Sequence, residues 1–127
     1  MFDGFDPTEY ENEARERWGG TAEYAESLRR TRLYGEREWA AIRTESEQIA
    51  DELARLMAAG VPAADPRAGE VVELHRDHIS RWFYECSAQV HRGLGEMYVA
   101  DARFTQNWDR HAPGLAVYVR DAILAAG

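Results

Sequence analysis

Histidine offers this chain its widest choice of chemistry, because His75 and His78 stand one helical turn apart. Two imidazoles at this spacing can approach one metal ion, but a usable site needs at least a third ligand nearby. Glu73 and Asp77 are close in sequence and point to other sides of a helix. We therefore favour the interpretation that His75 lines the core or a cavity with one ring nitrogen hydrogen-bonded, and we expect no metal site.

Nucleophilic catalysis needs an activated cysteine or serine beside an oriented base. Cys86 and His91 are five residues apart and do not share a helix face. Cys86 continues an apolar stripe, which predicts a buried side chain with a raised thiol pKa and little reactivity. The sequence has no phosphate-binding glycine loop, and its acidic residues are scattered over faces expected to be solvated. These patterns predict a protein that is not an enzyme and that carries no cofactor.

Helical periodicity fills the spaces between the few glycines and prolines, without an alternating strand pattern of useful length. The fold class predicted is all-α. Caps and glycine stops place helices over residues 6–18, 21–33, 35–60 and 104–110, with others starting at Pro66 and Pro113. The helix that starts at Pro66 is expected to continue through Cys86. Gly93 and Gly95 then indicate a break or a close helix approach before Tyr98.

Three apolar stripes predict which helix faces meet in the core. The stripe of the 35–60 helix follows spacings of three and four residues and comprises Trp39, Ile42, Ser46, Ile49, Leu53 and Leu56. The next helix contributes Val72, His75, Ile79, Trp82 and Cys86, with His78 and Phe83 on its flanks. The last helix contributes Leu115, Tyr118, Val119 and Ile123.

Size and charge restrict the possible partners. With 127 residues the chain predicts one domain, and a single cysteine excludes an internal disulfide framework. No apolar run approaches the roughly 20 residues that span a bilayer, and the first residues lack the pattern of a signal peptide. We therefore expect a cytoplasmic protein without a membrane partner. Its net charge of -8 repels phosphate backbones, so we expect no nucleic-acid binding by this chain alone.

The first 35 residues differ in composition from the rest. Seven of the fourteen aromatic residues lie within the first 39 positions, and the large aliphatic residues of the first 35 are only Met1, Leu28 and Leu33. Short helices with so little aliphatic surface are marginal by themselves. Within a single domain over residues 1–127, we expect residues 1–35 to form a mobile arm that docks on a helical core over 36–127. Its aromatic rings either close over a ligand or simply plug into the core.

Several motifs occur in one order along nearly the whole chain. They are HRDHISRWFYEC at 75–86, HRGLGEMYVAD at 91–101, RFT at 103–105, APGLA at 112–116 and RDAIL at 120–124. Together they resemble the TipAS family, the antibiotic-binding domain at the C-terminus of some MerR-type regulators. The resemblance implies a globin-like helical fold without heme. It also implies a cleft between an N-terminal arm and the core for apolar antibiotics such as thiopeptides. A stand-alone domain of this kind sequesters a drug, whereas one fused to a DNA-binding part senses it.

The resemblance also suggests which residues contact the drug. From the core we expect His75, His78, Ile79, Trp82, Cys86 and Met97, and from the N-terminal side Trp18, Tyr24 and Trp39. Thiopeptide-trapping members carry a cysteine in the H-x-C-L-G-E-M-Y motif, where this chain has Gly93. Cys86 matches the other cysteine of the family. We therefore expect mainly reversible binding, unless Cys86 faces the cleft.

Two other functions remain open from the sequence. The chain could be an interaction module whose apolar cleft docks a protein helix or a second copy, giving a homodimer. Alternatively, it could hold heme or a metal ion, with His75, His78 or His91 as the axial ligand.

Overall fold

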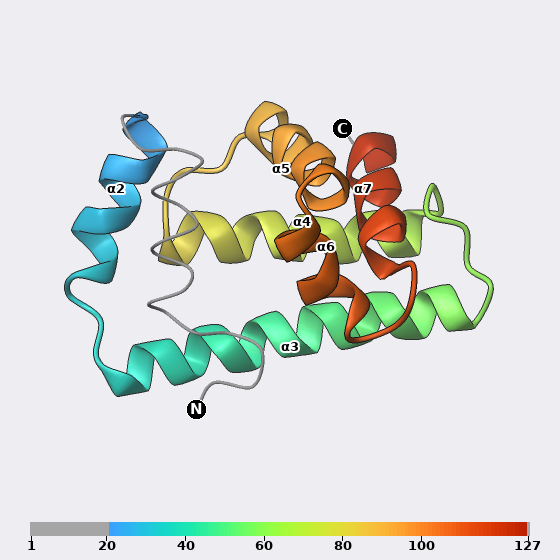
Figure 1. Cartoon of the computed structure of the whole chain (residues 1–127), viewed down its shortest axis with the longest axis horizontal. Helices are drawn as coiled ribbons and strands as arrows, with labels where there is room; N and C mark the ends of the chain where they lie inside the picture. The colour runs from blue at the N-terminus through green and yellow to red at the C-terminus, as the bar shows by residue number, and fades with distance from the viewer. Residues whose placement is uncertain (1–20, 127) are drawn as a thin grey trace.

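The computed structural model describes residues 21–126, and these residues fold into α-helices without a strand (Figure 1). The all-α fold class predicted from the sequence is therefore confirmed. The helices are α2 (Ala22–Thr31), α3 (Glu36–Ala58), α4 (Pro66–Trp82), α5 (Ala88–Ala100), α6 (Ala102–Asp109) and α7 (Leu115–Ala126). No helix in this part of the chain is long and apolar enough to cross a membrane.

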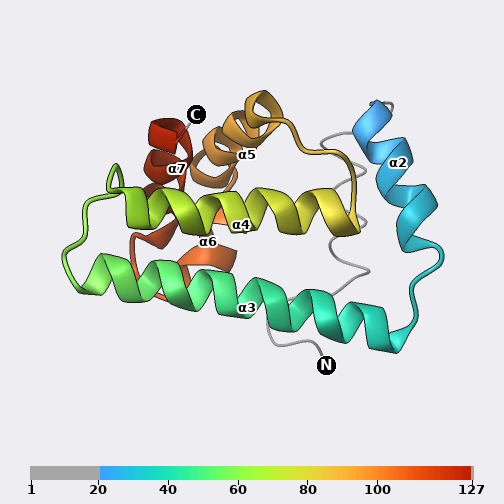
Figure 2. The ribbon, with the colours of Figure 1, turned by 180° about the vertical axis from the view of Figure 1, so that it is seen from behind.

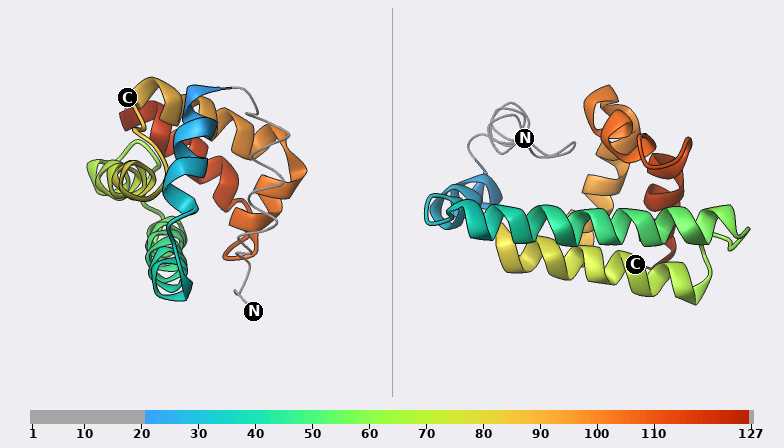
Figure 3. Two further views of the ribbon diagram at one scale, coloured as in Figure 1. Left: turned by 90° about the vertical axis from the view of Figure 1, so that its left-hand side faces the viewer. Right: turned by 90° about the horizontal axis from the view of Figure 1, so that it is seen from below.

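The two longest helices, α3 and α4, run antiparallel and form one layer of the molecule (Figures 1 and 2). The C-terminal helices α5, α6 and α7 pack together on one side of this pair (Figure 3). Helix α7 contacts α3, α4 and α5 and therefore lies at the centre of the packing. Helix α2 lies beside the C-terminal end of α4 (Figures 1 and 2).

The starts of α2 and α4 follow the capping residues that the sequence predicted, whereas α5 and α6 start after Ser87 and Asp101, which were not predicted as caps. The Thr21 hydroxyl accepts a hydrogen bond from the Tyr24 amide at 3.1 Å, and the Asp65 carboxylate accepts one from the Arg67 amide at 2.9 Å. Both bonds satisfy amides that the first turn of a helix leaves without partners. The last helix begins two residues later than predicted, at Leu115, because Gly114 has a positive φ of 85° and forms a turn.

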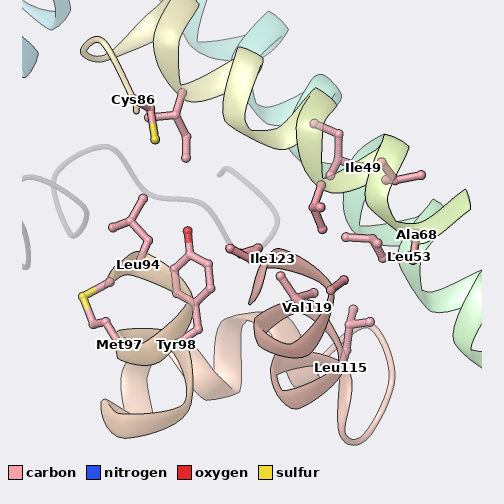
Figure 4. Packing of buried hydrophobic residues seen from close by; sticks show 14 of the residues in the cluster. Ile49, Leu53, Ala68, Cys86, Leu94, Met97, Tyr98, Leu115, Val119 and Ile123 are labelled. Atoms are coloured by element: carbon pink, nitrogen blue, oxygen red, sulfur yellow. The ribbon is translucent and has the colours of Figure 1, made fainter. Parts of the chain in front are cut away.

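The core forms where the predicted apolar stripes meet. Ile42, Ile49, Leu53 and Leu56 of α3 are buried, as are Leu115, Val119 and Ile123 of α7. Figure 4 shows the α7 side chains between those of α3 and α5. The stripes on α3 and α7 therefore correctly predicted the faces that pack inward.

The predicted course of α4 through Cys86 is wrong. The helix ends at Trp82, and both the Phe83 and Tyr84 amides donate to the Ile79 carbonyl, at 2.9 and 3.2 Å, so the regular ladder stops there. Cys86 lies in the connection to α5 and is still fully buried. Its burial comes from a loop that folds back, held by the Cys86 amide on the Ser80 hydroxyl at 3.0 Å and by Arg76 on the Cys86 carbonyl at 2.9 Å.

Gly93 and Gly95 both lie inside α5, so of the two possibilities that they indicated, the close approach is the one observed. A Cβ atom at Gly95 would meet the Ile123 Cδ1 atom at 3.4 Å and the Arg120 Cα atom at 3.5 Å. A Cβ at Gly93 would meet nothing within 4 Å. Gly95 therefore lets α5 and α7 approach closely, whereas Gly93 faces open space.

Helix α2 is the described part of the predicted arm, while the predicted 6–18 helix lies outside the described residues. The only buried residue of α2 is Ser27. The Arg30 guanidinium of α2 donates to the Ser80 carbonyl of α4 at 2.6 Å. In the connection after α2, the Tyr34 hydroxyl donates to the Trp82 carbonyl at 2.5 Å, and its ring packs against Trp82. Such hydrogen bonds contribute far less than the burial of aliphatic side chains that holds α3 and α7.

Candidate ligand-binding site

A cavity of about 140 Å³ lies among α3, α4, α5, α6 and the segments that follow α4 and α6. Its lining is largely apolar and aromatic, with a smaller number of polar and charged side chains, which is the usual character of a small-molecule site. The lining residues are Ser46, Glu47, Ala50, His75, His78, Ile79, Phe83, Tyr84, Leu94, Met97, Tyr98, Phe104, Asn107, Trp108, Arg110 and His111.

Aromatic rings from three segments form the apolar part of the lining. Tyr98 of α5 packs against Phe104 and Trp108 of α6, with ring centroids 6.2 and 5.4 Å apart. Phe83 and Tyr84 contribute from the connection after α4. These packed rings are held in place before any ligand arrives, so a flat aromatic group would lose little affinity to ordering the lining.

His75 forms one polar part of the cavity lining and is hydrogen-bonded to His91, which lies behind it and outside the lining. The His75 Nδ1 and His91 Nε2 atoms are 2.9 Å apart, and their rings are tilted by 33°. Burial lowers the pKa of His75 well below its ordinary value, and the neighbouring His91 lowers it further. Burial likewise lowers the pKa of His91 to about 4. Both rings are therefore neutral at pH 7, and the bond between them shares one proton.

A second polar group links α3 to α4 through His78. Its Nδ1 lies 2.6 Å from the Glu45 carboxylate and its Nε2 lies 3.3 Å from the Ser46 hydroxyl. Burial lowers the pKa of His78, although Glu45 opposes the shift. Because an ionised carboxylate only accepts, the neutral ring holds its proton on Nδ1 and its Nε2 accepts from Ser46.

Glu45 is the shared acceptor of this group. Besides His78, it accepts from the Trp82 indole at 3.2 Å and from the Arg81 guanidinium at 2.9 Å. Burial raises the pKa of Glu45, but the hydrogen bonds from His78 and Trp82 and the charge of Arg81 outweigh burial and lower it. The carboxylate is therefore ionised at pH 7 and fixes the orientation of His78.

The order Ser46, His78, Glu45 resembles that of a catalytic triad, but its setting differs. Acyl transfer also needs donors at the developing oxyanion. Ser46 lies in the interior of α3, where the backbone amides around it are used by the helix ladder. What the structure shows of Ser46, His78 and Glu45 is a hydrogen-bonded link between α3 and α4 that satisfies both ring nitrogens of His78.

The cavity rim carries charge. The Arg110 guanidinium donates to Glu47 at 2.6 Å, and His111 Nδ1 lies 3.2 Å from the Asp51 carboxylate. Within residues 21–126, Glu47, Asp51 and His111 are the group whose potential metal-ligand atoms lie within 4.8 Å of one another. The positive charge of Arg110 on Glu47 opposes the binding of a dication there.

The structure brings four of the nine expected contact residues to the cavity: His75, His78, Ile79 and Met97. Tyr24, Trp39, Trp82 and Cys86 are not in its lining, and Trp18 is outside the described residues. Trp39 and Trp82 instead both pack against Tyr34, with ring centroids 5.7 and 5.6 Å away, next to the attachment of α2. The His-x-x-His pair is also divided, since His75 bonds to His91 and His78 to Glu45.

Cys86 is buried as the sequence predicted. Its side chain is 0% exposed, and burial raises the pKa of the thiol to about 11. It is therefore protonated and a poor nucleophile at pH 7. A ligand in the cavity would meet no thiol from Cys86 or from position 93.

Sequence reasoning missed the α6 wall and the partners of the histidines. Phe104 lies in the RFT motif, and both Phe104 and Trp108 lie in the predicted 104–110 helix, but nothing in the sequence indicated that they line a cavity. Glu45 resembled an ordinary exposed acid. Ser46 did give a signal, because it is the one polar residue within the apolar stripe of α3. A polar side chain at such a position needs a buried partner, and His78 provides it.

The described residues thus form an all-helical domain around a cavity with the lining that is typical of small-molecule sites. Residues 10–126 match the TipAS antibiotic-recognition domain, so the chain belongs to this family. It is 46% identical over 125 residues to the HTH-type transcriptional activator TipA of Streptomyces coelicolor, covering 98% of this chain and 49% of that protein. It is 36% identical over 116 residues to the HTH-type transcriptional activator mta of Bacillus subtilis, covering 91% of this chain and 44% of that protein.

Solved structures agree with this assignment. The structure of TipAS from Streptomyces lividans in complex with nosiheptide, a thiopeptide antibiotic, matches with a TM-score of 0.89 and 46% identity, covering 98% of this chain and 87% of that one. The antibiotic-binding domain of a TipA-class multidrug resistance transcriptional regulator matches with a TM-score of 0.62 and 47% identity, covering 67% of this chain and 90% of that one. The chain spans about half the length of the transcriptional regulators it matches.

Proposed function

We propose that this chain binds bulky aromatic antibiotics of the thiopeptide kind, and that it thereby sequesters or senses them. The observation that carries the proposal is the preformed cavity with aromatic walls and neutral histidines, in a member of the TipAS family. A relative of 46% identity was solved with nosiheptide bound, which supports the same ligand class here. The net charge of -8 argues against a nucleic-acid ligand for this domain.

The cavity is large enough for only a part of a macrocyclic antibiotic. A volume of about 140 Å³ accommodates one or two rings, since an engineered cavity of about 150 Å³ holds benzene. Most of a macrocyclic antibiotic must therefore lie outside, over the rim near Asn107 and Arg110. We propose that residues 1–35 form the lid over this outer part, with Trp18 and Tyr24 as candidate contacts from the lid and Trp39 as a candidate contact from α3 beside it. The weak apolar attachment of α2 supports a movable element.

We further propose that binding is reversible. The thiol of Cys86 is buried and protonated, and position 93 has no side chain to react. Affinity would then come from burial of apolar area, at about 25 cal/mol per Å², less the free energy of ordering the lid. Few directional contacts would permit ligands of varied structure.

The direct test is a titration with nosiheptide, followed by tryptophan fluorescence and circular dichroism. Ala50 lines the cavity and Ala58 is exposed on the same helix, so Ala50→Phe and Ala58→Phe form a matched pair. We expect wild type and Ala58→Phe to bind equally and Ala50→Phe to bind at least about tenfold more weakly. No response to nosiheptide or to a wider panel of antibiotics would contradict the proposal, as would unchanged binding by a folded Ala50→Phe variant.

The alternative function is association with a second copy of the chain. Leu74 of α4 and Val117 and Leu124 of α7 are large apolar side chains that are 58%, 46% and 43% exposed. Light scattering over a range of concentrations tests this alternative. A concentration-dependent mass without any response to antibiotics would favour an interaction module over a drug-binding domain.

A further inference from the structure

His75 reaches the cavity with the ring nitrogen that the histidine pair does not use. Its Nδ1 is hydrogen-bonded to His91, and the ring has no second hydrogen bond among the described residues. Within the same residues, no fully buried side-chain nitrogen lacks a hydrogen-bond partner. His75 lines the cavity and His91 does not. The Nε2 atom of His75 must therefore be open to the cavity.

The pair can hold its shared proton in two ways without breaking its bond. In one state, His75 Nδ1 donates to His91 Nε2, so His75 Nε2 is a bare acceptor and His91 Nδ1 carries a proton. In the other state, His91 Nε2 donates to His75 Nδ1, so His75 Nε2 carries the proton and His91 Nδ1 is bare. To pass between them, His75 Nε2 gains a proton, one proton crosses the shared bond and His91 Nδ1 loses one. The number of protons on the pair does not change.

The neighbours of the pair leave both states available. Tyr98 and Trp108 meet the His75 ring edge to face, with centroids 6.1 and 5.4 Å away. Within residues 21–126, neither ring of the pair is hydrogen-bonded to a carboxylate that would fix its proton. The charges of Glu73 and Arg76 act on the pKa of His91 in opposite directions, and these two side chains are hydrogen-bonded to each other. His78, one turn along α4, is different, because Glu45 holds the proton on its Nδ1. One helix thus presents an adaptable and a fixed imidazole to the same cavity.

We propose that His91 makes His75 a two-way polar contact, which accepts from a ligand N–H or donates to a ligand ring nitrogen at the same place. This inference rests on the proposed function, because it concerns the aromatic group that enters the cavity. It explains how one buried polar group can serve ligands of opposite hydrogen-bonding character without being left unsatisfied, which would cost affinity. His75 and His91 together are then determinants of broad specificity.

Indole, quinoline and naphthalene are suitable probes, because they share a bicyclic shape and offer a donor, an acceptor and neither. The test measures imidazole ¹⁵N chemical shifts of the wild-type protein, which distinguish protonated from bare ring nitrogens. With indole we expect a bare His75 Nε2, and with quinoline a protonated one, with His91 changing in the opposite sense and His78 constant. An identical His75 tautomer with both probes, or no response to either, would overturn the inference.

Affinity supplies an independent readout. We expect wild type to bind indole and quinoline within about threefold of each other. In His91→Phe, which keeps a ring but no nitrogen, one His75 tautomer is favoured, and the two affinities should differ by at least about fivefold while that for naphthalene changes little. An equal loss for all three probes would mean that His91 acts only through packing. If His91→Phe does not fold, the ¹⁵N measurement on wild type still decides. If nosiheptide binds while indole and quinoline leave the same His75 tautomer, this inference is refuted and the proposed function stands.

Discussion

Mild acid should destabilise this fold through its buried histidines. Burial lowers the pKa of His91 to about 4, whereas an unfolded chain returns it to about 6.5. Between these values the unfolded state binds more protons, so the free energy of unfolding falls as the pH falls. From pH 7 to pH 5, His91 alone accounts for a loss of about 2 kcal/mol. His75, whose pKa is also lowered by burial, adds to the loss in the same direction.

The choice of pH window separates this effect from that of the carboxylates. Glu45 has a lowered pKa, since its hydrogen bonds and the charge of Arg81 outweigh burial, so its contribution is lost only below its unfolded value of about 4.5. Above pH 5 the histidines therefore dominate the pH dependence. Urea unfolding followed by tryptophan fluorescence at pH 7, 6 and 5 measures the effect, provided that the m-value stays constant.

The variant His91→Gln provides the control, because glutamine keeps hydrogen-bonding capacity and does not titrate. Between pH 7 and pH 5, the free energy of unfolding of this variant should fall by about 2 kcal/mol less than that of wild type. Equal stability of wild type at both pH values would refute the assignment of neutral, buried histidines. A His91→Gln variant with the full wild-type pH dependence would refute the part given to His91.

Three further predictions concern α5 and the cysteine. Gly93→Ala should raise the free energy of unfolding by about 0.5–1 kcal/mol, because alanine is favoured over glycine inside a helix and its Cβ meets open space. Gly95→Leu should lower it by about 1–3 kcal/mol, because the side chain would force α5 away from α7. The opposite order of the two variants in urea unfolding would contradict this packing. Cys86 should resist a disulfide reagent at pH 8 in the native state and react on unfolding, since burial raises its pKa to about 11; fast native labelling would show that the loop opens. Gly93→Cys should form an adduct with a dehydroalanine-bearing thiopeptide that mass spectrometry detects and wild type lacks, and an adduct on wild type would show that Cys86 reacts.

Local signals predicted most of the helices, because caps and stripes act over one or two turns. Thr21, Asp65 and Pro66 start helices where the sequence indicated. The end of α4 was not predictable in this way, because the Phe83–Cys86 segment turns inward to fill the core and mimics the helical spacing only by chance. Burial of Cys86 was thus predicted correctly, although the secondary structure around it was not.

The candidate site was only half predictable for a related reason. His75 and His78 stood out by residue type and spacing, but their partners, His91 and Glu45, come from α5 and α3 and depend on how the helices pack. The α6 wall with Phe104 and Trp108 follows from the same packing. Helical periodicity identifies the face of a helix and does not identify what that face meets.

Hydrogen–deuterium exchange with and without nosiheptide tests the central claim most directly, because it reports binding and its place together. We expect slower exchange in three places: the cavity segments of α5 and α6, residues 104–111 in particular; the start of the chain over residues 1–35; and the α4 turn that carries His75. Protection confined to residues outside the cavity, or exchange that nosiheptide leaves unchanged at saturating concentration, would contradict the account.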